Sequence, residues 1–350
     1  MNKIKCNIKN DGIHWDTTKV CSYGQFINWI ILIGTRGTGK TTGVMRQCIS
    51  DYNRGLGGFI YLKRYKPDIE LSAKKLCKKY NKKIECKPIK NSSFVYEYEK
   101  EQIGYAIPLS VTASYKSTDF VDDDGKPNIC NIIFDEAILK RGSKQQYIND
   151  EMGVLLEFVS TVMRERKNYR VWIMANNMDI TNPVFAYFNI QQFEGQIWID
   201  KTRGVYVENI LPSKMLSEVQ EETPLYRLTK GTTYGDYHYK NKPLVSSHKT
   251  IGVKSGKDKL MFRLGFNNVT LNVYLRDEEL AYYIEVRNKV INDNMTYNIM
   301  NNNKINYFYV SLFKQDKQPK IFLKLYADNK IIYENEVAIQ LIEDFVEIIK

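Results

Sequence analysis

Residues 34–41 of the chain read GTRGTGKT and satisfy the pattern G-x-x-x-x-G-K-[ST]. Glycines in such a loop let successive backbone N–H groups converge on phosphate oxygens, where a Cβ atom would clash. The lysine reaches the β- and γ-phosphates, and the hydroxyl after it ligates Mg²⁺. The spacing therefore predicts a nucleotide-binding loop, the Walker A motif, whose contacting residues are Gly34, Thr35, Arg36, Gly37, Thr38, Gly39, Lys40, Thr41 and Thr42.

A pair of carboxylates ends the apolar stretch NICNIIFDEA (128–137), as in a Walker B strand. Asp135 is predicted to hold Mg²⁺, with Thr41 as a second ligand, and Glu136 to polarise the attacking water. Adjacent strand residues point to opposite faces, so the pair is expected to act where the chain turns. GTPase-type P-loops usually lack this glutamate, so Glu136 indicates hydrolysis of ATP. The competing interpretation is a strand that ends on two solvated acids.

Polar residues at the end of a second apolar run and of a predicted helix are further candidates. Asn176, near the end of VWIMANN (171–177), is a candidate sensor of the γ-phosphate, although asparagine is also common in a plain strand-end turn. Arg164 and Arg166 end the helix predicted for residues 150–166. Either arginine could complement the helix dipole, or could act as an arginine finger on a neighbouring subunit's ATP.

The elements that must position these residues alternate between apolar strands and helices up to about residue 200. This alternation predicts an α/β domain with a mostly parallel sheet covered on both faces. Residues 201–245 have few apolar runs and are interpreted as a linker. From residue 246 onwards short alternating segments, including NYFYVSLF, predict a small strand-rich α+β domain, with INDNMTYNIMNNNKIN (291–306) as a loop. The predicted domains are therefore 1–200, 201–245 and 246–350.

Composition excludes several classes of protein. Six cysteines lie within the first 130 residues without a C-x-x-C pair, and three histidines are scattered, so neither a zinc site nor a disulfide scaffold is expected. No segment approaches the roughly 18 apolar residues of a membrane helix, and the first residues lack the apolar core of a signal peptide. These features predict a reduced, cytoplasmic protein without a membrane partner.

The net charge of +11 favours a polyanionic partner. Residues 63–90 hold eleven Lys and Arg residues against three acids. A solvated helix face is one interpretation of this run, and contact with nucleic-acid phosphates, which requires only positive charge, is the other. Lys63, Arg64 and Lys66, directly after the second predicted strand, are the candidate contacts.

Several motifs, taken together and in order, resemble the phi29-like phage DNA-packaging ATPases over residues 24–240, with weaker similarity to the end. They are FIYLKRYKPDI, GYAIPLSV with SYKS, IIFDEA, VSTVMRERKNYRV, VWIMANN with NPVFAYFN, and GTTYGD. The loop GTRGTGKT also resembles the Walker A motif of large terminase subunits, in which Arg36 is part of the signature.

The resemblance implies a homo-oligomeric ring, a homopentamer, at the portal (connector) vertex of an empty prohead in the host cytoplasm. The ring would pump double-stranded DNA inward with ATP, and the resemblance allows for a structural packaging RNA. It assigns the trans-acting arginine to Arg164 rather than Arg166. It also makes Lys116, in SYKS, a lysine that reaches the neighbour's nucleotide. The family often has two arginines where this chain has Lys63 and Arg64, and lysine lacks the bidentate fork of arginine.

The resemblance also implies a C-terminal domain like a degenerate RNase H-type nuclease. Asn267 and Asn268 stand where a catalytic aspartate is expected, and amides are poor Mg²⁺ ligands beside carboxylates. Asp277, Glu278 and Glu279 lie on a later turn. We therefore expect no nuclease activity. Two alternatives remain: a terminase-type ATPase that also cleaves DNA, and a nucleotide-gated nucleic-acid-binding module that hydrolyses poorly.

Overall fold

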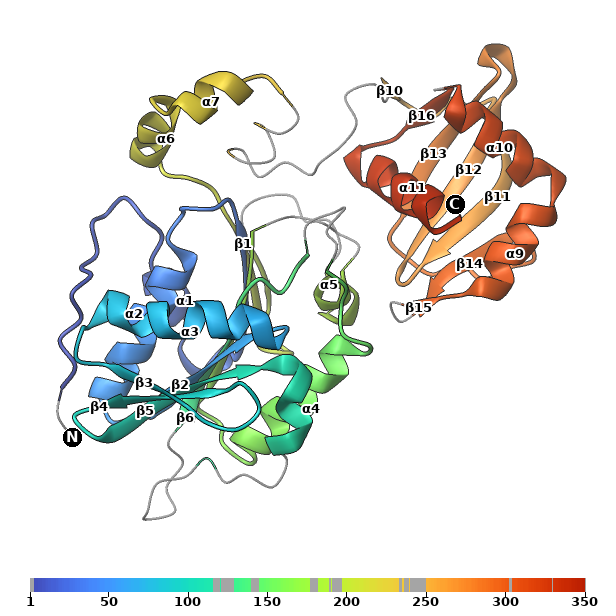
Figure 1. Ribbon diagram of the computed structural model, residues 1–350. Coiled ribbons are helices and arrows are strands. Elements are labelled where there is room, and N and C mark those ends of the chain that lie inside the picture. The colour runs from blue at the N-terminus through green and yellow to red at the C-terminus, as the bar shows by residue number, and fades with distance from the viewer. Residues whose placement is uncertain are drawn as a thin grey trace. The chain divides into compact units, whose positions relative to one another are not determined.

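The computed structural model divides into two compact units (Figure 1). The first comprises Met1–Met178, Glu194–Lys230 and Gly235–Asn241, and the second comprises Asp179–Phe193, Gly231–Tyr234 and Lys242–Lys350. Within them the structure describes residues 3–115, 120, 129–139, 145–176, 182–188, 190, 197–232, 235, 239, 250–301, 304–328 and 330–349.

A nine-stranded sheet forms the centre of the first unit, in the order β3-β4-β5-β2-β6-β7-β1-β9-β8. From β5 to β9 in this order every pair is parallel, and the pairs at the two edges are antiparallel. The predicted α/β class with a mostly parallel sheet is thus confirmed. The strands are β1 (Trp29–Gly34), β2 (Gly58–Lys63), β3 (Glu85–Pro88), β4 (Phe94–Tyr98), β5 (Glu101–Pro108), β6 (Ile129–Phe134), β7 (Arg170–Ala175), β8 (Ile197–Asp200) and β9 (Val205–Ile210).

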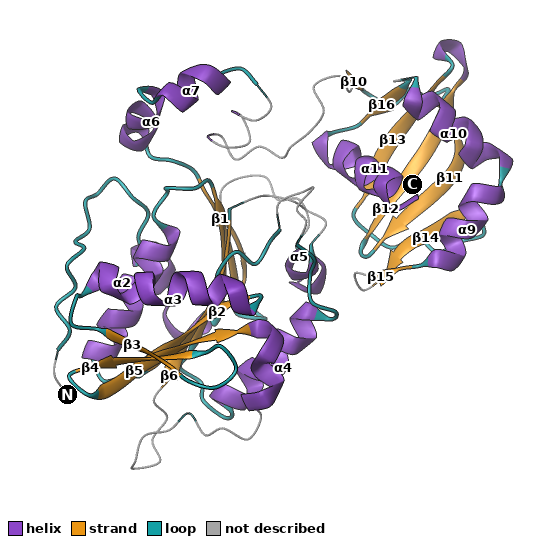
Figure 2. Ribbon diagram, viewed as in Figure 1, coloured by secondary structure: helices purple, strands orange, loops and turns teal. Residues whose placement is uncertain are grey.

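Helices cover the central strands, which explains why these strands are apolar almost without interruption. Helices α2 (Lys40–Asn53) and α3 (Lys66–Tyr80) lie over one face of the sheet (Figure 2). Helix α4 (Glu151–Met163) packs against β6. The remaining helical elements of this unit are α1 (Thr18–Cys21), α6 (Lys214–Glu221), α7 (Pro224–Thr229) and the 3₁₀ turns η1 (Gly24–Phe26) and η2 (Leu109–Tyr115).

The interpretation of residues 201–245 as a linker is wrong for β9, which pairs with β1 in the main sheet. A Cβ atom added at Gly34 would lie 2.4 Å from the Ile210 carbonyl oxygen, so this pairing needs a glycine at the start of the phosphate loop. The sequence signal failed because Glu208 interrupts the apolar pattern. That residue is only 4% exposed, and its carboxylate accepts hydrogen bonds from Trp15 and Tyr206 at 3.0 and 2.8 Å.

The second unit holds a mixed seven-stranded sheet in the order β10-β16-β13-β12-β11-β14-β15. Strands β11, β12 and β13 form an antiparallel meander, whereas β14 and β16 pair in parallel with it. Three helices pack on one face through a core that includes Phe262, Phe313 and Phe345 (Figure 1). The elements are α5 (Pro183–Phe188), β10 (Thr250–Ile251), β11 (Lys259–Phe266), β12 (Val269–Arg276), η3 (Asp277–Glu279), β13 (Ala281–Arg287), β14 (Thr296–Asn301), β15 (Lys304–Ile305), α9 (Tyr307–Gln315), α10 (Lys317–Ala327), β16 (Ile331–Tyr333) and α11 (Glu336–Ile349).

Two sequence interpretations in this unit are wrong. NYFYVSLF forms helix α9 rather than a strand, with Val310 and Phe313 buried at helical spacing. Its large apolar residues occupy both odd and even positions, so a period of two does not separate strand from helix there. The polar tract 291–306 contains β14 and β15, because pairing with β11 overrides its low apolar content. In the described part of the chain, no helix is long and apolar enough to cross a membrane.

Candidate active site

The phosphate loop lies between β1 and α2, and its glycines adopt conformations that other residues avoid. Gly37 and Gly39 have φ of +83° and +95°. A Cβ atom at Gly39 would also lie 2.7 Å from the Cβ of His14, because the N-terminal segment crosses the loop. The backbone N–H of Trp15 donates to the Thr38 carbonyl at 2.9 Å. The N-terminal segment therefore holds the loop in place from outside.

Lys40 is the first residue of α2 and is only 6% exposed. Its ammonium donates to the carbonyl oxygens of Gly34 and Thr35 at 2.7 and 2.9 Å. Burial lowers the pKa of Lys40 to about 8, although the nearby Asp135 carboxylate acts in the opposite direction. Lys40 is thus a poorly solvated cation bonded only to neutral oxygens, and phosphate oxygens would be better partners for it.

A cavity of about 440 Å³ opens at this loop, large enough for a nucleotide. Of the predicted binding residues, Gly34, Thr35 and Thr38 do not line it. Thr35 and Thr38 are buried behind the loop, where the Thr38 hydroxyl donates to the Thr35 carbonyl at 3.0 Å. The predicted residues that line the cavity are Arg36, Gly37, Gly39, Lys40, Thr41, Thr42 and Asn176.

Two further residues line the cavity and were missed by the sequence analysis. They are His14 and Lys79, and the Lys79 ammonium donates to the Thr42 hydroxyl at 3.3 Å. Lys79 lies among several lysines of helix α3, so its sequence position does not distinguish it. The fold brings it to the cavity by placing α3 beside the start of α2. His14 lies in a segment without a motif, so no local signal could have found it.

Asp135 and Glu136 follow β6 in a tight turn fixed by the strands on either side. The Asp135 N–H donates to the Leu62 carbonyl of β2, and the Ala137 N–H donates to the Met174 carbonyl of β7. Burial raises the pKa of the Asp135 carboxyl, while Lys63 and a hydrogen bond from Tyr61 at 2.7 Å oppose that rise. Glu136 has a φ of +57°, and its side chain is about half exposed.

Lys63 and Arg64, which we expected to contact nucleic acid, both turn toward the Asp135–Glu136 turn. The Lys63 ammonium lies 2.7 Å from a Glu136 carboxylate oxygen. Arg64 is only 3% exposed and is paired with Glu151, so its guanidinium has no surface on which to receive a phosphate. Lys66, the first residue of α3, is exposed.

The oxygen donors at this site suit Mg²⁺. Thr41 lines the cavity and Asp135 acts electrostatically on Lys40 within it. A hydroxyl and a carboxylate, completed by phosphate oxygens and water, are the usual ligands of a nucleotide-bound Mg²⁺. The described residues include no cluster of three or more His, Cys, Asp or Glu side chains placed to hold an ion. An ion here would therefore depend on the nucleotide for most of its ligands.

The two candidate finger arginines differ in their surroundings. Arg164 ends α4 with a φ of +46° and is exposed. Arg166 is half-buried and donates a hydrogen bond to the Ile129 carbonyl at the start of β6. Of the two, Arg164 is the one presented outward. Lys116 lies outside the described residues.

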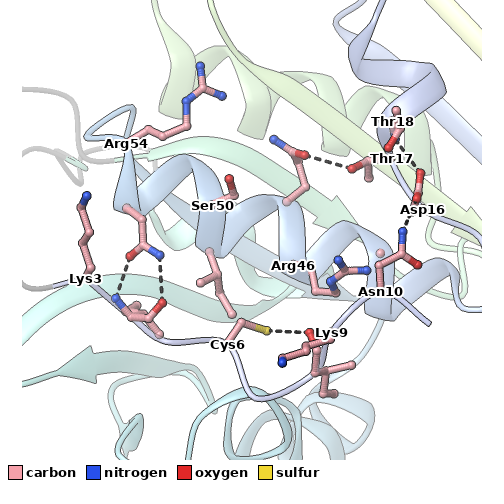
Figure 3. Close-up of a pocket in the computed structure, with 16 residues that line it drawn as sticks. Lys3, Cys6, Lys9, Asn10, Asp16, Thr17, Thr18, Arg46, Ser50 and Arg54 are labelled. Atoms are coloured by element: carbon pink, nitrogen blue, oxygen red, sulfur yellow. Dashed lines mark hydrogen bonds between the residues drawn. The ribbon is translucent and has the colours of Figure 1, made fainter. Parts of the chain in front are cut away.

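A second cavity, of about 700 Å³, separates the N-terminal segment from one flank of α2 (Figure 3). Asn53 of α2 exchanges hydrogen bonds with the Ile4 backbone at 2.7 and 2.9 Å and fixes one end of this groove. Among the described residues, Asp16 is the only acid that lines it, and the lining cations are Lys3, Lys9, Arg46 and Arg54. The groove is thus basic and holds none of the predicted site residues.

The strand order places β7 between the phosphate-loop strand β1 and the carboxylate strand β6. The chain is thus an α/β protein in which one strand separates the phosphate-loop strand from the carboxylate strand. The model of the podovirus DNA encapsidation protein (Gp16) family matches residues 9–345. The chain belongs to this family.

Individual relatives agree with this family. The DNA packaging proteins of Bacillus phages PZA and phi29 are each 26% identical to the chain over 333 residues, which cover 93% of the chain and 94% of each relative. The solved bacteriophage phi29 viral genome packaging motor assembly contains a chain that superposes with a TM-score of 0.63 at 22% identity, over 97% of this chain and 100% of that chain. The resemblance predicted from the sequence is confirmed: this is a DNA packaging motor protein of the phi29-like phages.

The lowered pKa of Lys40 predicts that ATP binding depends on pH. Phosphates favour the charged ammonium, so the pKa of Lys40 rises when ATP binds. In solution above about pH 8, where much of the free protein has an uncharged Lys40, binding therefore adds a proton to this side chain. The affinity for ATP should fall as pH rises through about 8, approaching about tenfold per pH unit. Equilibrium binding of a fluorescent ATP analogue between pH 6.5 and 9.5 measures this dependence.

The Lys40→Arg variant is the matched control, because arginine keeps its charge over this range. Its affinity should be weaker overall but should lack the decline centred near pH 8. An equal decline in both proteins would show that another group causes it.

Proposed function

We propose that the chain hydrolyses ATP with Mg²⁺ and uses the reaction to translocate double-stranded viral DNA into an empty prohead. The observation that carries the proposal is that Lys40 and Asn176 line one cavity at the carboxyl-end edge of the parallel sheet, where Asp135, the neighbour of Glu136, acts electrostatically on Lys40. Ligands bind at this edge in open α/β sheets, outside the carboxyl ends of the strands. Membership of the encapsidation family supplies the packaging context.

Each residue has a role that its surroundings allow. Lys40 leaves the loop carbonyls to bind the β- and γ-phosphates, and Thr41 with Asp135 would hold Mg²⁺, which neutralises charge on the phosphates when bound. Glu136 orients and polarises the attacking water. Because Lys63 pairs with Glu136 at 2.7 Å, this ion pair must open or shift before the carboxylate faces the water. Asn176, which lines the cavity, would sense the γ-phosphate.

The proposal places the chain in a homo-oligomeric ring, a pentamer on the prohead at the portal vertex, in the host cytoplasm. Each subunit would offer Arg164 to its neighbour's ATP, and the exposure of this residue at the end of α4 supports that role. The same proposal gives Lys116 a contact with the neighbour's nucleotide. A trans-acting arginine stabilises charge in the transition state and makes hydrolysis depend on ring assembly.

Nucleic-acid contacts are proposed at two surfaces of the first unit. Lys66 is exposed at the start of α3, near the end of β2. The groove beside α2 presents Lys9 and Arg46, and Asp16 is the one acid among its described lining residues. Translocated DNA and a structural packaging RNA offer the same phosphodiester chemistry to such cations.

For the second unit we propose a nucleic-acid-gripping role on a degenerate nuclease-like fold, without cleavage. Asn267 lies in the β11–β12 turn with a φ of +48°, and the Asn268 amide donates to the Ala186 carbonyl at 3.1 Å. Neither amide replaces a catalytic carboxylate as an Mg²⁺ ligand. A plasmid incubated with the protein and Mg²⁺ or Mn²⁺ should stay intact. Efficient cleavage would favour the terminase-type alternative.

DNA should stimulate ATP turnover, and salt should weaken this stimulation. The logarithm of DNA affinity should fall linearly with the logarithm of salt concentration, because phosphate contacts release counterions. Lys66→Ala should reduce the slope by about 0.9, the effect of one lost phosphate contact. Lys201→Ala, which removes an exposed lysine from the β8–β9 turn, is the matched control and should leave the slope unchanged. A slope near zero in the wild-type protein would contradict phosphate gripping.

Mixed rings test the trans-acting arginine. Glu136→Gln and Arg164→Ala should each lower turnover by about 10³-fold or more in assembled rings while ATP still binds. Mixing the two inactive variants should restore activity, because an Arg164→Ala subunit keeps its own Glu136 and receives an arginine from its neighbour. Lys167→Ala, an exposed cation three residues beyond, is the control and should stay active. Without restoration the finger does not act in trans. Negligible wild-type turnover that Glu136→Gln leaves unchanged would favour the nucleotide-gated module.

A further inference from the structure

Arg64 makes four hydrogen bonds near the site, although it is not among the residues that line the cavity. Its guanidinium binds Glu151 as a fork, with Nε 2.6 Å from one carboxylate oxygen and an Nη atom 2.9 Å from the other. The same Nη atom donates to the Ala137 carbonyl at 2.8 Å, and the other Nη atom donates to the Glu136 carbonyl at 3.3 Å. One planar cation therefore joins three segments: the end of β2, the Asp135–Glu136 turn and the first turn of α4.

We propose that Arg64 is a positioning residue for ATP hydrolysis, which fixes the backbone of Glu136 and ties that turn to helix α4. The inference rests on the proposed function. Arg64 acts through Glu136, whose side chain would contact the attacking water, and through the helix that leads to Arg164.

The conformation of Glu136 explains why such support is needed. A φ of +57° is unfavourable for a residue with a side chain and persists only where the surroundings hold it. The Asp135 N–H is bound by β2, and the Ala137 N–H, which lies in the same planar peptide unit as the Glu136 carbonyl, is bound by β7. The contact from Arg64 adds a second restraint to that peptide unit, through its carbonyl oxygen. The Glu136 side chain is about half exposed and pairs with Lys63, so its direction depends on that ion pair and on its backbone.

Glu151 extends the arrangement to α4. Its carboxylate is buried and accepts a third hydrogen bond, from the Ile148 N–H at 3.1 Å. The helix of 13 residues that begins at Glu151 is roughly 20 Å long and is capped at its far end by Arg164. A shift of the Asp135–Glu136 turn is thus transmitted to the base of the helix that carries the proposed finger.

Arginine is required by geometry as well as by charge. The guanidinium also lies over the rings of Phe134 and Tyr147, with 5.6 and 5.1 Å from its central carbon to the ring centres. Lysine offers a single point charge and cannot bind both carboxylate oxygens and two carbonyls at once. A lysine at this position would therefore keep the positive charge but lose the hydrogen-bond geometry. The Arg64→Lys variant thus tests the geometry separately from the charge.

The test must remove the fork without leaving a buried charge unpaired, which would unfold the protein. The double variant Arg64→Met/Glu151→Leu replaces the pair by apolar side chains, a change that buried pairs often tolerate. We expect an unchanged melting temperature within a few degrees, ATP affinity within about threefold of wild type, and a kcat at least about 100-fold lower. Arg64→Lys should fold and bind ATP, with kcat about tenfold or more below wild type.

A matched control exists in the second unit, where Arg276 binds Asp258 as a fork at 3.0 and 2.9 Å. The corresponding double variant Arg276→Met/Asp258→Leu should leave basal kcat unchanged. Wild-type kcat in a folded Arg64→Met/Glu151→Leu variant would overturn the proposal, as would wild-type kcat in Arg64→Lys should the double variant fail to fold.

Mixed rings test the link to α4. Subunits of Arg64→Met/Glu151→Leu should fail to restore turnover to Arg164→Ala subunits, although they keep Arg164 itself. Restoration equal to that given by Glu136→Gln subunits would overturn the link. A wild-type protein without ATP turnover would instead refute the proposed function, so the two failures are distinguishable.

Discussion

Parallel pairing of β1, β7 and β6 is the constraint on which the site depends. Ile173 of β7 lies level with Ile31 of β1 and with Phe134 of β6. Beyond this level the three parallel strands end at the same edge of the sheet. Strand β1 leads to Gly34 and the phosphate loop, β7 leads to Asn176, and β6 leads to the Asp135–Glu136 turn. Residues more than 100 positions apart in sequence, such as Gly34 and Asn176, therefore reach the same edge of the sheet. A one-residue slip in either pairing would turn one set of side chains to the opposite face.

At this edge of the sheet, the balance between positively and negatively charged side chains determines how the site residues are arranged. Two lysines face two carboxylates: Lys40 is influenced by Asp135, and Lys63 is paired with Glu136. Burial disfavours each isolated charge, as the lowered pKa of Lys40 and the raised pKa of Asp135 indicate. Phosphates would add negative charge beside Lys40, and a metal ion would add positive charge beside Asp135, whose carboxylate Lys63 approaches to 4.0 Å. The site is thus electrostatically incomplete on its own and suited to a metal–nucleotide pair.

The sequence predicted those parts of the fold and site whose signals are local. The glycines of the phosphate loop, Lys40 and the apolar run before Asp135 can each be recognised from a few neighbouring residues. Strand β9 was not predicted because a glutamate is normally a surface residue. Glu208 can be buried because its carboxylate accepts hydrogen bonds from Trp15 and Tyr206. His14 reaches the cavity because an irregular segment crosses the phosphate loop. Arg64 was assigned to nucleic acid because charge alone does not distinguish a buried fork from an exposed contact.

Helix α4 connects the Asp135–Glu136 turn with the exposed surface that carries Arg164. Its first residue, Glu151, is buried in the polar contacts behind the Asp135–Glu136 turn, and the residue that ends it, Arg164, is exposed. The positive φ of Arg164 turns the chain out of the helix axis at that point. On the proposed function, one rigid element would have its base in one active site and present its tip to the next. Coupling between subunits would then need no long pathway of small shifts, because a packed helix moves as a unit.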